Sequence, residues 1–270
     1  MSGRSSVRWG QHFLVDSSIR DFIVSLAELS AKDVVLEIGV GTGFLTEALA
    51  KSSARVIGIE KDPELFKQAT VLFGDFDNVF LHCFDVLELD LDLLLQRFSK
   101  DNIKLVSNLP YYLSTEIVTR VLFCNVDWQL AVLMVQREFA EKTFLGIPRR
   151  KKGPLSVIVP FMVEVQGMWP VPRSAFRPMP RVDSVIVKLC FKREKLDKPL
   201  LDKLWRIAQC LFAERRKKVG TILKRCFPQL SPRIILNELG LENARAEDLS
   251  PADWLSLIRA LSAMEKGSGE

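Results

Sequence analysis

Short apolar stretches alternate with longer amphipathic ones between Val34 and Pro110. The short stretches are rich in β-branched residues, as buried strands are, whereas the longer ones repeat with the period of a helix. Strands are therefore predicted at residues 34–39, 55–60, 79–86 and 103–110, and helices at residues 44–53, 63–74 and 90–99. This alternation predicts βαβ units and a parallel sheet with helices on both faces.

The pattern changes in the second half of the chain. Three further strands are expected at residues 131–135, 157–165 and 184–191, with an antiparallel edge to the sheet at the last of them. From Lys198 onward the apolar residues follow a helical period, broken or restarted at prolines. The predicted fold is α/β, with a Rossmann-like sheet in residues 1–195 and a small all-α C-terminal domain in residues 196–270.

The composition is that of a globular protein, with 48% apolar residues in a chain of 270. No apolar run approaches the roughly 20 residues that cross a bilayer, and the first residues lack the apolar core of a secretory signal, so a cytoplasmic protein is expected. The five cysteines never stand in C-x-x-C spacing, which argues against a disulfide framework and a zinc site and predicts reduced thiols. Two histidines exclude a histidine-rich metal centre.

Positive charge is concentrated in the C-terminal part of the chain. Residues 1–190 hold 22 Lys and Arg against 22 Asp and Glu, whereas residues 191–270 hold 16 against 11. This asymmetry suggests a polyanionic partner for the helical domain, although a solvated basic surface explains the charge alone equally well.

A glycine-rich loop follows the first predicted strand. Gly39, Gly41 and Gly43 form a G-x-G-x-G pattern, whereas a dinucleotide site needs G-x-G-x-x-G. Glu37 precedes the loop, and a carboxylate there disfavours a pyrophosphate but tolerates a sulfonium and an ammonium group. The predicted cofactor is therefore S-adenosylmethionine, and the alternative is a tight turn that binds nothing.

Two acidic residues end the next predicted strands. Glu60 is placed to accept both ribose hydroxyls of a cofactor, and Asp85, with Val86 beside it, to receive the adenine amine. The carboxyl ends of parallel strands meet at one edge of a sheet, so these residues are expected to converge with the glycine loop. An acidic residue after a strand also commonly caps the following helix, which is the alternative for Asp85.

The fourth predicted strand ends in Asn108-Leu109-Pro110-Tyr111, a motif without the usual bases or nucleophiles. An exocyclic adenine amine is a poor nucleophile, but the Asn108 side-chain oxygen and the Leu109 carbonyl can hold its two hydrogens. Pro110 fixes the turn, and Tyr111 offers a ring on which the base stacks. The motif therefore predicts methyl transfer to adenine without a general base; a strand-ending turn with a packed tyrosine is the alternative.

Eight stretches carry a resemblance to a known family. They are GQHFL at 10–14, VLEIGVGTGFLT at 35–46, GIEKD at 58–62, FDV at 84–86, NLPYYLST at 108–115, GPLSV at 153–157, FRPMPRVDSVIVKL at 176–189 and FAERRKKVGTIL at 212–223. In this order they resemble the rRNA adenine N6,N6-dimethyltransferase family, of the KsgA type that modifies bacterial small-subunit RNA. The resemblance implies dimethylation of adenines in a loop of 16S rRNA during ribosome assembly.

The resemblance also implies roles for single positions. It places His12 and Leu14 by the methionine end of the cofactor, Gly39 and Gly41 in its loop, Glu60 at the ribose, Asp85 at the adenine, Asn108 by the methyl group, and Tyr111 and Phe176 as stacking rings. From the residues alone, Phe176 is an ordinary core residue. Tyr112 stands where the family commonly has asparagine and is expected to narrow the pocket.

An adenine inside a helix cannot reach such a pocket, so the target is expected in a loop or flipped out. Two basic runs are predicted to hold the RNA: Arg149, Arg150, Lys151 and Lys152 in a loop, and Arg215, Arg216, Lys217 and Lys218 on a helix of the C-terminal domain. For each of these two runs, the alternative is a solvated stretch of charge that binds nothing. The enzyme is expected to be a monomer without a metal.

Three other functions are alternatives for this sequence. A methyltransferase of large-subunit (23S) rRNA, of the macrolide-resistance type, shares the cofactor loop and a related Asn-x-Pro-Tyr turn. A non-catalytic RNA-binding assembly or transcription factor on the same fold would lack turnover, which the intact Glu60, Asp85 and Asn108 argue against. A nicotinamide-dependent oxidoreductase is disfavoured by the glycine spacing.

Overall fold

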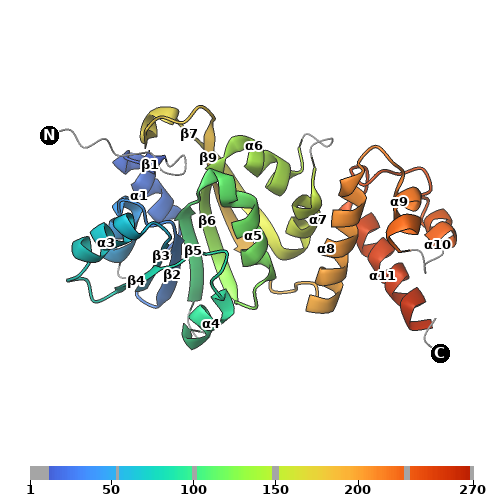
Figure 1. Ribbon diagram of the computed structural model, residues 1–270, viewed down its shortest axis with the longest axis horizontal. Coiled ribbons are helices and arrows are strands. Elements are labelled where there is room, and N and C mark those ends of the chain that lie inside the picture. Colours follow the sequence, from blue (N-terminus) through green and yellow to red (C-terminus); the bar gives the residue numbers. More distant parts are fainter. Residues whose placement is uncertain (1–11, 53–54, 99–101, 148–151, 228–231, 268–270) are drawn as a thin grey trace. The chain divides into compact units, whose positions relative to one another are not determined.

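The computed structural model describes residues 12–52, 55–98, 102–147, 152–227 and 232–267 (Figure 1). The chain divides into two compact units, Met1–Ala140 with Val165–Phe191, and Glu141–Glu164 with Lys192–Glu270. Each unit is described by itself. The catalytic and RNA-binding domains predicted for residues 1–195 and 196–270 stay predictions.

A seven-stranded sheet forms the first unit, in the order β4-β3-β2-β5-β6-β9-β7. Its strands are β2 (Asp33–Ile38), β3 (Arg55–Glu60), β4 (Val79–Cys83), β5 (Asn102–Asn108), β6 (Trp128–Gln136), β7 (Val163–Val171) and β9 (Ser184–Phe191). The pairs from β4 to β6 are parallel, and β9 runs antiparallel to β6. The predicted α/β fold is confirmed, and the strand order reverses beside β2, where such sheets bind ligands.

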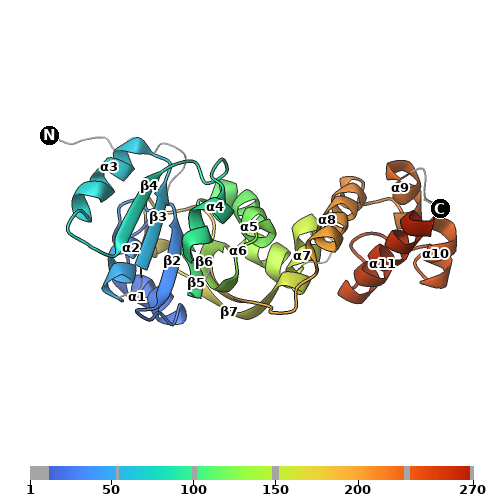
Figure 2. The same cartoon turned by 90° about the horizontal axis from the view of Figure 1, so that it is seen from below.

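Two short strands, β1 (Phe13–Leu14) and β8 (Phe176–Arg177), pair antiparallel next to this sheet. The helices of the first unit are α1 (Ser17–Leu26), α2 (Phe44–Lys51), α3 (Pro63–Leu72), α4 (Leu91–Leu95), α5 (Ser114–Phe123) and α6 (Arg137–Ala140). Figure 2 shows α1 and α2 on one side of the sheet and α4 and α5 on the other.

Side chains alternate between the two faces of the sheet, as the pleat of a strand requires. On β6, Leu130, Val132 and Met134 belong to the core cluster that also includes residues of α1 and α2. The intervening residues of β6 are also buried, so both faces are covered. This burial accounts for the continuous apolar runs that mark the strands in the sequence.

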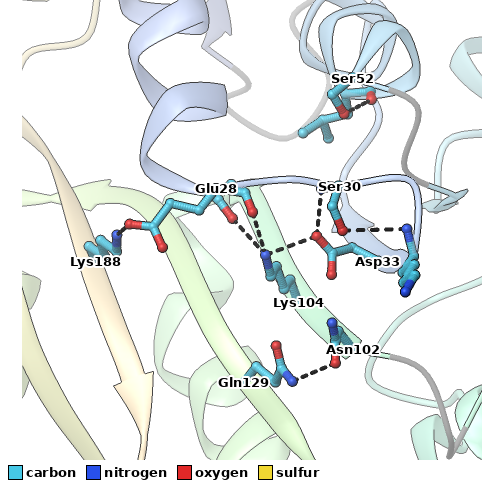
Figure 3. Close-up of polar contacts among 11 residues, drawn as sticks. Glu28, Ser30, Asp33, Ser52, Asn102, Lys104, Gln129 and Lys188 are labelled. Atoms are coloured by element: carbon cyan, nitrogen blue, oxygen red, sulfur yellow. Dashed lines mark hydrogen bonds and ion pairs between the residues drawn. The ribbon is translucent and has the colours of Figure 1, made fainter.

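A buried lysine binds several groups at the end of the sheet where the parallel strands begin (Figure 3). Lys104 is 7% exposed, and its Nζ donates to the Ala27 carbonyl at 3.1 Å, the Glu28 carbonyl at 2.7 Å and Asp33 Oδ2 at 3.0 Å. The two carbonyls belong to the residues that directly follow α1, at the helix C-terminus, where a cation is favoured. The contacts join α1, β2 and β5, while Lys188 holds the Glu28 carboxylate.

The second unit is helical. It contains a π-helical turn (Glu141–Leu145), α7 (Pro154–Met162), α8 (Lys198–Ala213), α9 (Val219–Cys226), α10 (Pro232–Glu238) and α11 (Pro251–Gly267). The rings of Phe212 and Trp254 stack between α8 and α11, with centroids 6.3 Å apart. The helices predicted from Lys198 onward are confirmed. No helix within the described ranges has the length and apolar character needed to span a membrane.

The strand predicted at residues 157–165 is wrong, because α7 runs to Met162 and β7 begins only at Val163. Pro154 stands in the first turn of the helix, and the Ser156 hydroxyl donates to the Gly153 carbonyl at 2.7 Å. A short β-branched run that is buried all round reads the same whether it forms a strand or a helix. The helix-starting residues Gly153, Pro154 and Ser156 distinguish the two possibilities here and favour a helix.

The prediction that all cysteines are reduced is wrong for one pair. Cys210 on α8 and Cys226 on α9 form a disulfide, with their Cα atoms 6.6 Å apart. The two residues are 16 positions apart and meet because two consecutive helices pack side by side, which cysteine spacing does not reveal. Cys83, Cys124 and Cys190 do not take part in a disulfide.

Candidate functional site

A cavity of about 260 Å³ opens at the carboxyl ends of the parallel strands in the first unit. Its lining includes Gly39, Gly41, Glu60, Asp85 and Val86, all predicted as cofactor residues. The lining also includes His12 and the motif at residues 108–111. The two predicted halves of the site therefore share one cavity.

The glycine loop leaves β2 and enters α2 with left-handed backbone. Gly41 has a φ of 58°, and a Cβ atom there would lie 3.2 Å from the Phe13 ring. Phe13 thus packs directly on the loop, so Gly41 is required both by its conformation and by this close approach. The Gly39 N–H donates to the Ile59 carbonyl at 2.7 Å, which fixes the loop against β3.

Glu60 is a buried carboxylate at the end of β3, 5% exposed, that faces this cavity. Its Oε2 accepts from the Gly41 N–H and its Oε1 from the Asp62 N–H, both at 2.8 Å. These two donors fix the plane of the carboxylate and support its negative charge. Each oxygen retains a lone pair for a hydroxyl of a bound ligand.

Asp85 follows β4 and forms an ion pair with Lys61, a residue that was not predicted to belong to the site. Its Oδ2 lies 2.5 Å from Lys61 Nζ, and its Oδ1 accepts from the Leu87 N–H at 2.9 Å. The hydrogen bond from Lys61 is the main cause that lowers the pKa of the Asp85 carboxyl. Asp85 is therefore an ionised acceptor at the cavity wall, and it also caps the turn after β4.

Asn108 ends β5 with its amide orientation set by the N-terminal segment. Its Nδ2 donates to the His12 carbonyl at 3.3 Å, so its Oδ1 is left to accept from a ligand. Ser107, which precedes it, donates to the Ile38 carbonyl at 2.6 Å, and the Leu109 N–H donates to the Met134 carbonyl at 3.1 Å. The motif is thus tied to β2 and β6 by the residues on both sides of Asn108.

Tyr111 closes the same side of the cavity. Its hydroxyl shares a 2.5 Å hydrogen bond with Ser184 Oγ, and its ring centroid lies 5.8 Å from that of His12. His12 Nδ1 lies 2.7 Å from the Pro178 carbonyl; a carbonyl only accepts, so Nδ1 carries the proton. Tyr112 is 52% exposed and lines the cavity; that it narrows the pocket stays a prediction.

Comparison with known protein families shows to which family the chain belongs. A family model described as "Ribosomal RNA adenine dimethylase" matches residues 4–263. This chain belongs to the ribosomal RNA adenine dimethylase family. The predicted resemblance and the predicted enzyme class, an rRNA adenine dimethyltransferase, are confirmed.

Individual relatives of this dimethylase support the family assignment. "Ribosomal RNA small subunit methyltransferase A" of Listeria innocua is 34% identical, over 94% of this chain and 89% of the relative. Among solved structures, a dimethyladenosine transferase from Plasmodium falciparum has a TM-score of 0.76 and 27% identity, over 95% of this chain and 98% of the other. The 23S rRNA methyltransferase ErmE has a TM-score of 0.69 and 26% identity, over 93% of this chain and 99% of the other.

Three predicted site residues of the dimethylase do not line the cavity. Leu14 and Phe176 pair across β1 and β8 and are 5% and 0% exposed within the core. Phe176 therefore occupies the place of an ordinary core residue, which its sequence environment alone favours. Glu37 lies on β2 behind the glycine loop, where its Oε2 accepts from the Thr46 hydroxyl at 2.6 Å.

The cavity lining also includes residues that were not predicted, among them Phe13, Lys61 and Phe84. Each of these three adjoins a predicted residue in the sequence, His12, Glu60 and Asp85 respectively. Their position next to predicted site residues is the sequence signal that could have identified them. Consecutive residues near the end of a strand lie at the same edge of the sheet. Among the described residues, no cluster of His, Cys, Asp or Glu has the form of a metal site.

The second predicted basic run of the dimethylase is not on a helix, because α8 ends at Ala213 and α9 begins at Val219. Residues 215–218 form the turn between the two helices. Within the turn, Lys217 pairs with Glu214 at 2.6 Å and Lys218 Nζ donates to Asn243 Oδ1 at 2.7 Å, while Arg216 is exposed. Of the first run, only Lys152 is described; Arg149, Arg150 and Lys151 lie outside the described residues.

We expect the buried carboxyl group of Glu37 to make the stability of the protein depend on pH. Burial raises the pKa of its carboxyl from 4.5 to about 8, helped by the nearby Glu60 and opposed by the Thr46 hydroxyl. Between these values the folded protein holds a proton that the unfolded chain has released, so the free energy of unfolding falls as the pH rises from about 4.5 to about 8. Denaturant unfolding at pH 5, 6, 7 and 8 should show this fall in the wild type.

A Glu37→Gln variant is the control for this prediction. Glutamine cannot titrate and keeps an acceptor for Thr46, so the difference in stability between variant and wild type should grow with pH across the same window. Parallel pH profiles for the two proteins would show that Glu37 does not carry the effect.

Proposed function

We propose that this dimethylase transfers methyl groups from S-adenosylmethionine to the exocyclic amine of adenines in a loop of small-subunit (16S) rRNA, in the cytoplasm and during ribosome assembly. The observation that carries the proposal is the shared cavity, which is lined by Glu60 and Asp85 as well as by Asn108 and Tyr111. Relatives named for the small subunit, at 32% to 35% identity, support this choice of RNA.

The residues present fit S-adenosylmethionine. Glu60 is held by two backbone donors with a lone pair free on each oxygen, which suits the two hydroxyls of a ribose. Asp85 is an ionised acceptor suited to an adenine amine. The cavity wall carries carboxylates, which suits a cationic donor better than a pyrophosphate. When bound, this cofactor supplies an electrophilic methyl group.

The acceptor side then has to orient a weak nucleophile. With its Nδ2 committed to the His12 carbonyl, Asn108 offers Oδ1 to one hydrogen of the amine, and the Leu109 carbonyl offers itself to the other. Two acceptors favour the pyramidal nitrogen whose lone pair attacks. Tyr111 provides the face on which the base stacks, worth roughly 1–3 kcal/mol. The amine loses its proton after transfer, so no base is needed beforehand.

The choice between the two ribosomal subunits is tested by labelled methyl transfer. Purified small and large subunits lacking the modification are incubated in parallel with the enzyme and labelled S-adenosylmethionine. Label in the small-subunit RNA alone supports the proposal, while label in the large-subunit RNA alone supports the activity named for ErmE. The lower identity to ErmE, 26% against 34% for the Listeria innocua relative, favours the first result.

The RNA is proposed to be held through phosphates by the turn between α8 and α9. Reversing Arg216 and Lys218 to glutamate should lower RNA affinity more than tenfold at low salt and flatten the slope of log affinity against log salt by about two. Lys67→Glu, an exposed reversal on α3 of the first unit, is the control and should change neither quantity. Unchanged affinity of the double variant at low salt would remove this turn from the RNA surface.

A further inference from the structure

Ser184 lies directly behind the acceptor side of the cavity without lining it. It is the first residue of β9 and is 1% exposed. Its hydroxyl and that of Tyr111 share the 2.5 Å hydrogen bond, although the two residues are 73 positions apart. A buried tyrosine hydroxyl without a partner is costly, so this contact is a specific anchor for the tip of the ring.

The anchor itself is fixed. Ser184 pairs in register with Gln136 of β6, and the carbonyl of the preceding residue, Asp183, accepts from the Arg137 N–H at 2.8 Å. The Asp183 carboxylate accepts from Arg173 Nε at 2.7 Å. The hydroxyl of Ser184 therefore stands at a defined point of the sheet rather than on a loose loop.

The other end of the Tyr111 ring is fixed as well. Pro110 precedes it with a φ of −60°, and the Leu113 N–H donates to the Pro110 carbonyl at 3.0 Å, so the turn that carries Tyr111 is closed. With the backbone set by this turn and the hydroxyl set by Ser184, both ends of the long axis of the ring are held. Stacking depends on where the ring lies, because a displaced ring would move the amine away from Asn108.

We propose that Ser184 is a positioning residue for methyl transfer, which holds the hydroxyl end of the Tyr111 ring in place and thereby aligns the stacked adenine with Asn108. The inference rests on the proposed function, since it needs an adenine in the cavity. Ser184 does not touch the adenine or the cofactor and acts only through the tyrosine.

A double-mutant cycle of Ser184→Ala and Tyr111→Phe tests this inference. Each variant keeps the tyrosine-like ring but loses one hydroxyl of the pair, and each is expected to lower kcat on undermethylated small subunits about tenfold. The double variant should be no slower than the slower single variant, since both remove the same contact. The affinity for S-adenosylhomocysteine, measured by calorimetry, should stay within twofold of the wild type.

Ser184→Thr is the matched control, because threonine keeps the hydroxyl and suits a strand. It should restore kcat to within about threefold of the wild type. An unchanged kcat in Ser184→Ala, losses that multiply in the double variant, or a cofactor affinity that falls in step with kcat would overturn the inference. A wild-type enzyme that transfers no methyl overturns the proposed function instead, so the two failures are distinguishable.

Discussion

Replacing Asn108 with alanine is expected to lower kcat for methyl transfer by about a thousandfold. The variant loses the acceptor that holds one hydrogen of the amine and with it the orientation of the lone pair. It also loses the 3.3 Å bond to the His12 carbonyl, so cofactor affinity is expected to fall by up to about tenfold. Initial rates on undermethylated small subunits, at saturating cofactor, separate the two effects.

Asn102→Ala is the control for this expectation. Asn102 begins the same strand, β5, but its Oδ1 accepts from Gln129 Nε2 at 2.6 Å at the opposite end of the sheet (Figure 3). Its loss removes the same chemical group without touching the cavity, and kcat should stay within twofold of the wild type. An Asn108→Ala variant that retains a tenth or more of the wild-type kcat would contradict the role given to the amide oxygen.

Replacing Glu60 with glutamine is expected to weaken cofactor binding by a hundredfold or more. In the wild type, both carboxylate oxygens accept backbone N–H groups at 2.8 Å and keep lone pairs for the ribose hydroxyls. Glutamine has one such oxygen, and its NH₂ group faces a donor, so about 3 kcal/mol of charge-assisted hydrogen bonding is lost. Calorimetric titration with S-adenosylhomocysteine measures the change directly.

Glu47→Gln serves as the control, since Glu47 is a surface carboxylate on α2 that pairs with Lys51 at 2.5 Å. Its affinity for the cofactor should equal that of the wild type. A thermal melt of Glu60→Gln establishes that the variant is folded. A dissociation constant within threefold of the wild-type value in the folded variant would show that Glu60 does not hold the cofactor.

The parts of the fold that sequence predicts well are those in which local pattern and tertiary structure agree. The β-branched run of β2 is buried on both faces, and Asp62 and Pro63 start α3 as capping residues do, with Asp62 accepting from the Glu64 N–H at 2.9 Å. The carboxyl ends of β3, β4 and β5 then converge because parallel strands leave no other choice. Glu60, Asp85 and Asn108 could therefore be brought together from sequence alone.

The remaining features depend on contacts between distant segments. The Tyr111–Ser184 bond and the Cys210–Cys226 disulfide join residues whose proximity follows from packing and not from spacing. Phe176 is drawn into the core by the pairing of β1 with β8, a two-residue ladder too short to leave a periodic signal. Lys61 reaches Asp85 because β3 and β4 are neighbours, but its charge in the sequence looks like that of any surface lysine.

The central claim is that one cavity brings a methyl donor and an adenine amine together. The most direct test is mass spectrometry of nucleosides from small-subunit RNA, taken after incubation with the wild type or with Asn108→Ala. We expect N6,N6-dimethyladenosine with the wild type and almost none with the variant, even when the variant binds cofactor and RNA. Equal amounts of dimethyladenosine from both enzymes, or no methylated adenosine from the wild type, would contradict the claim.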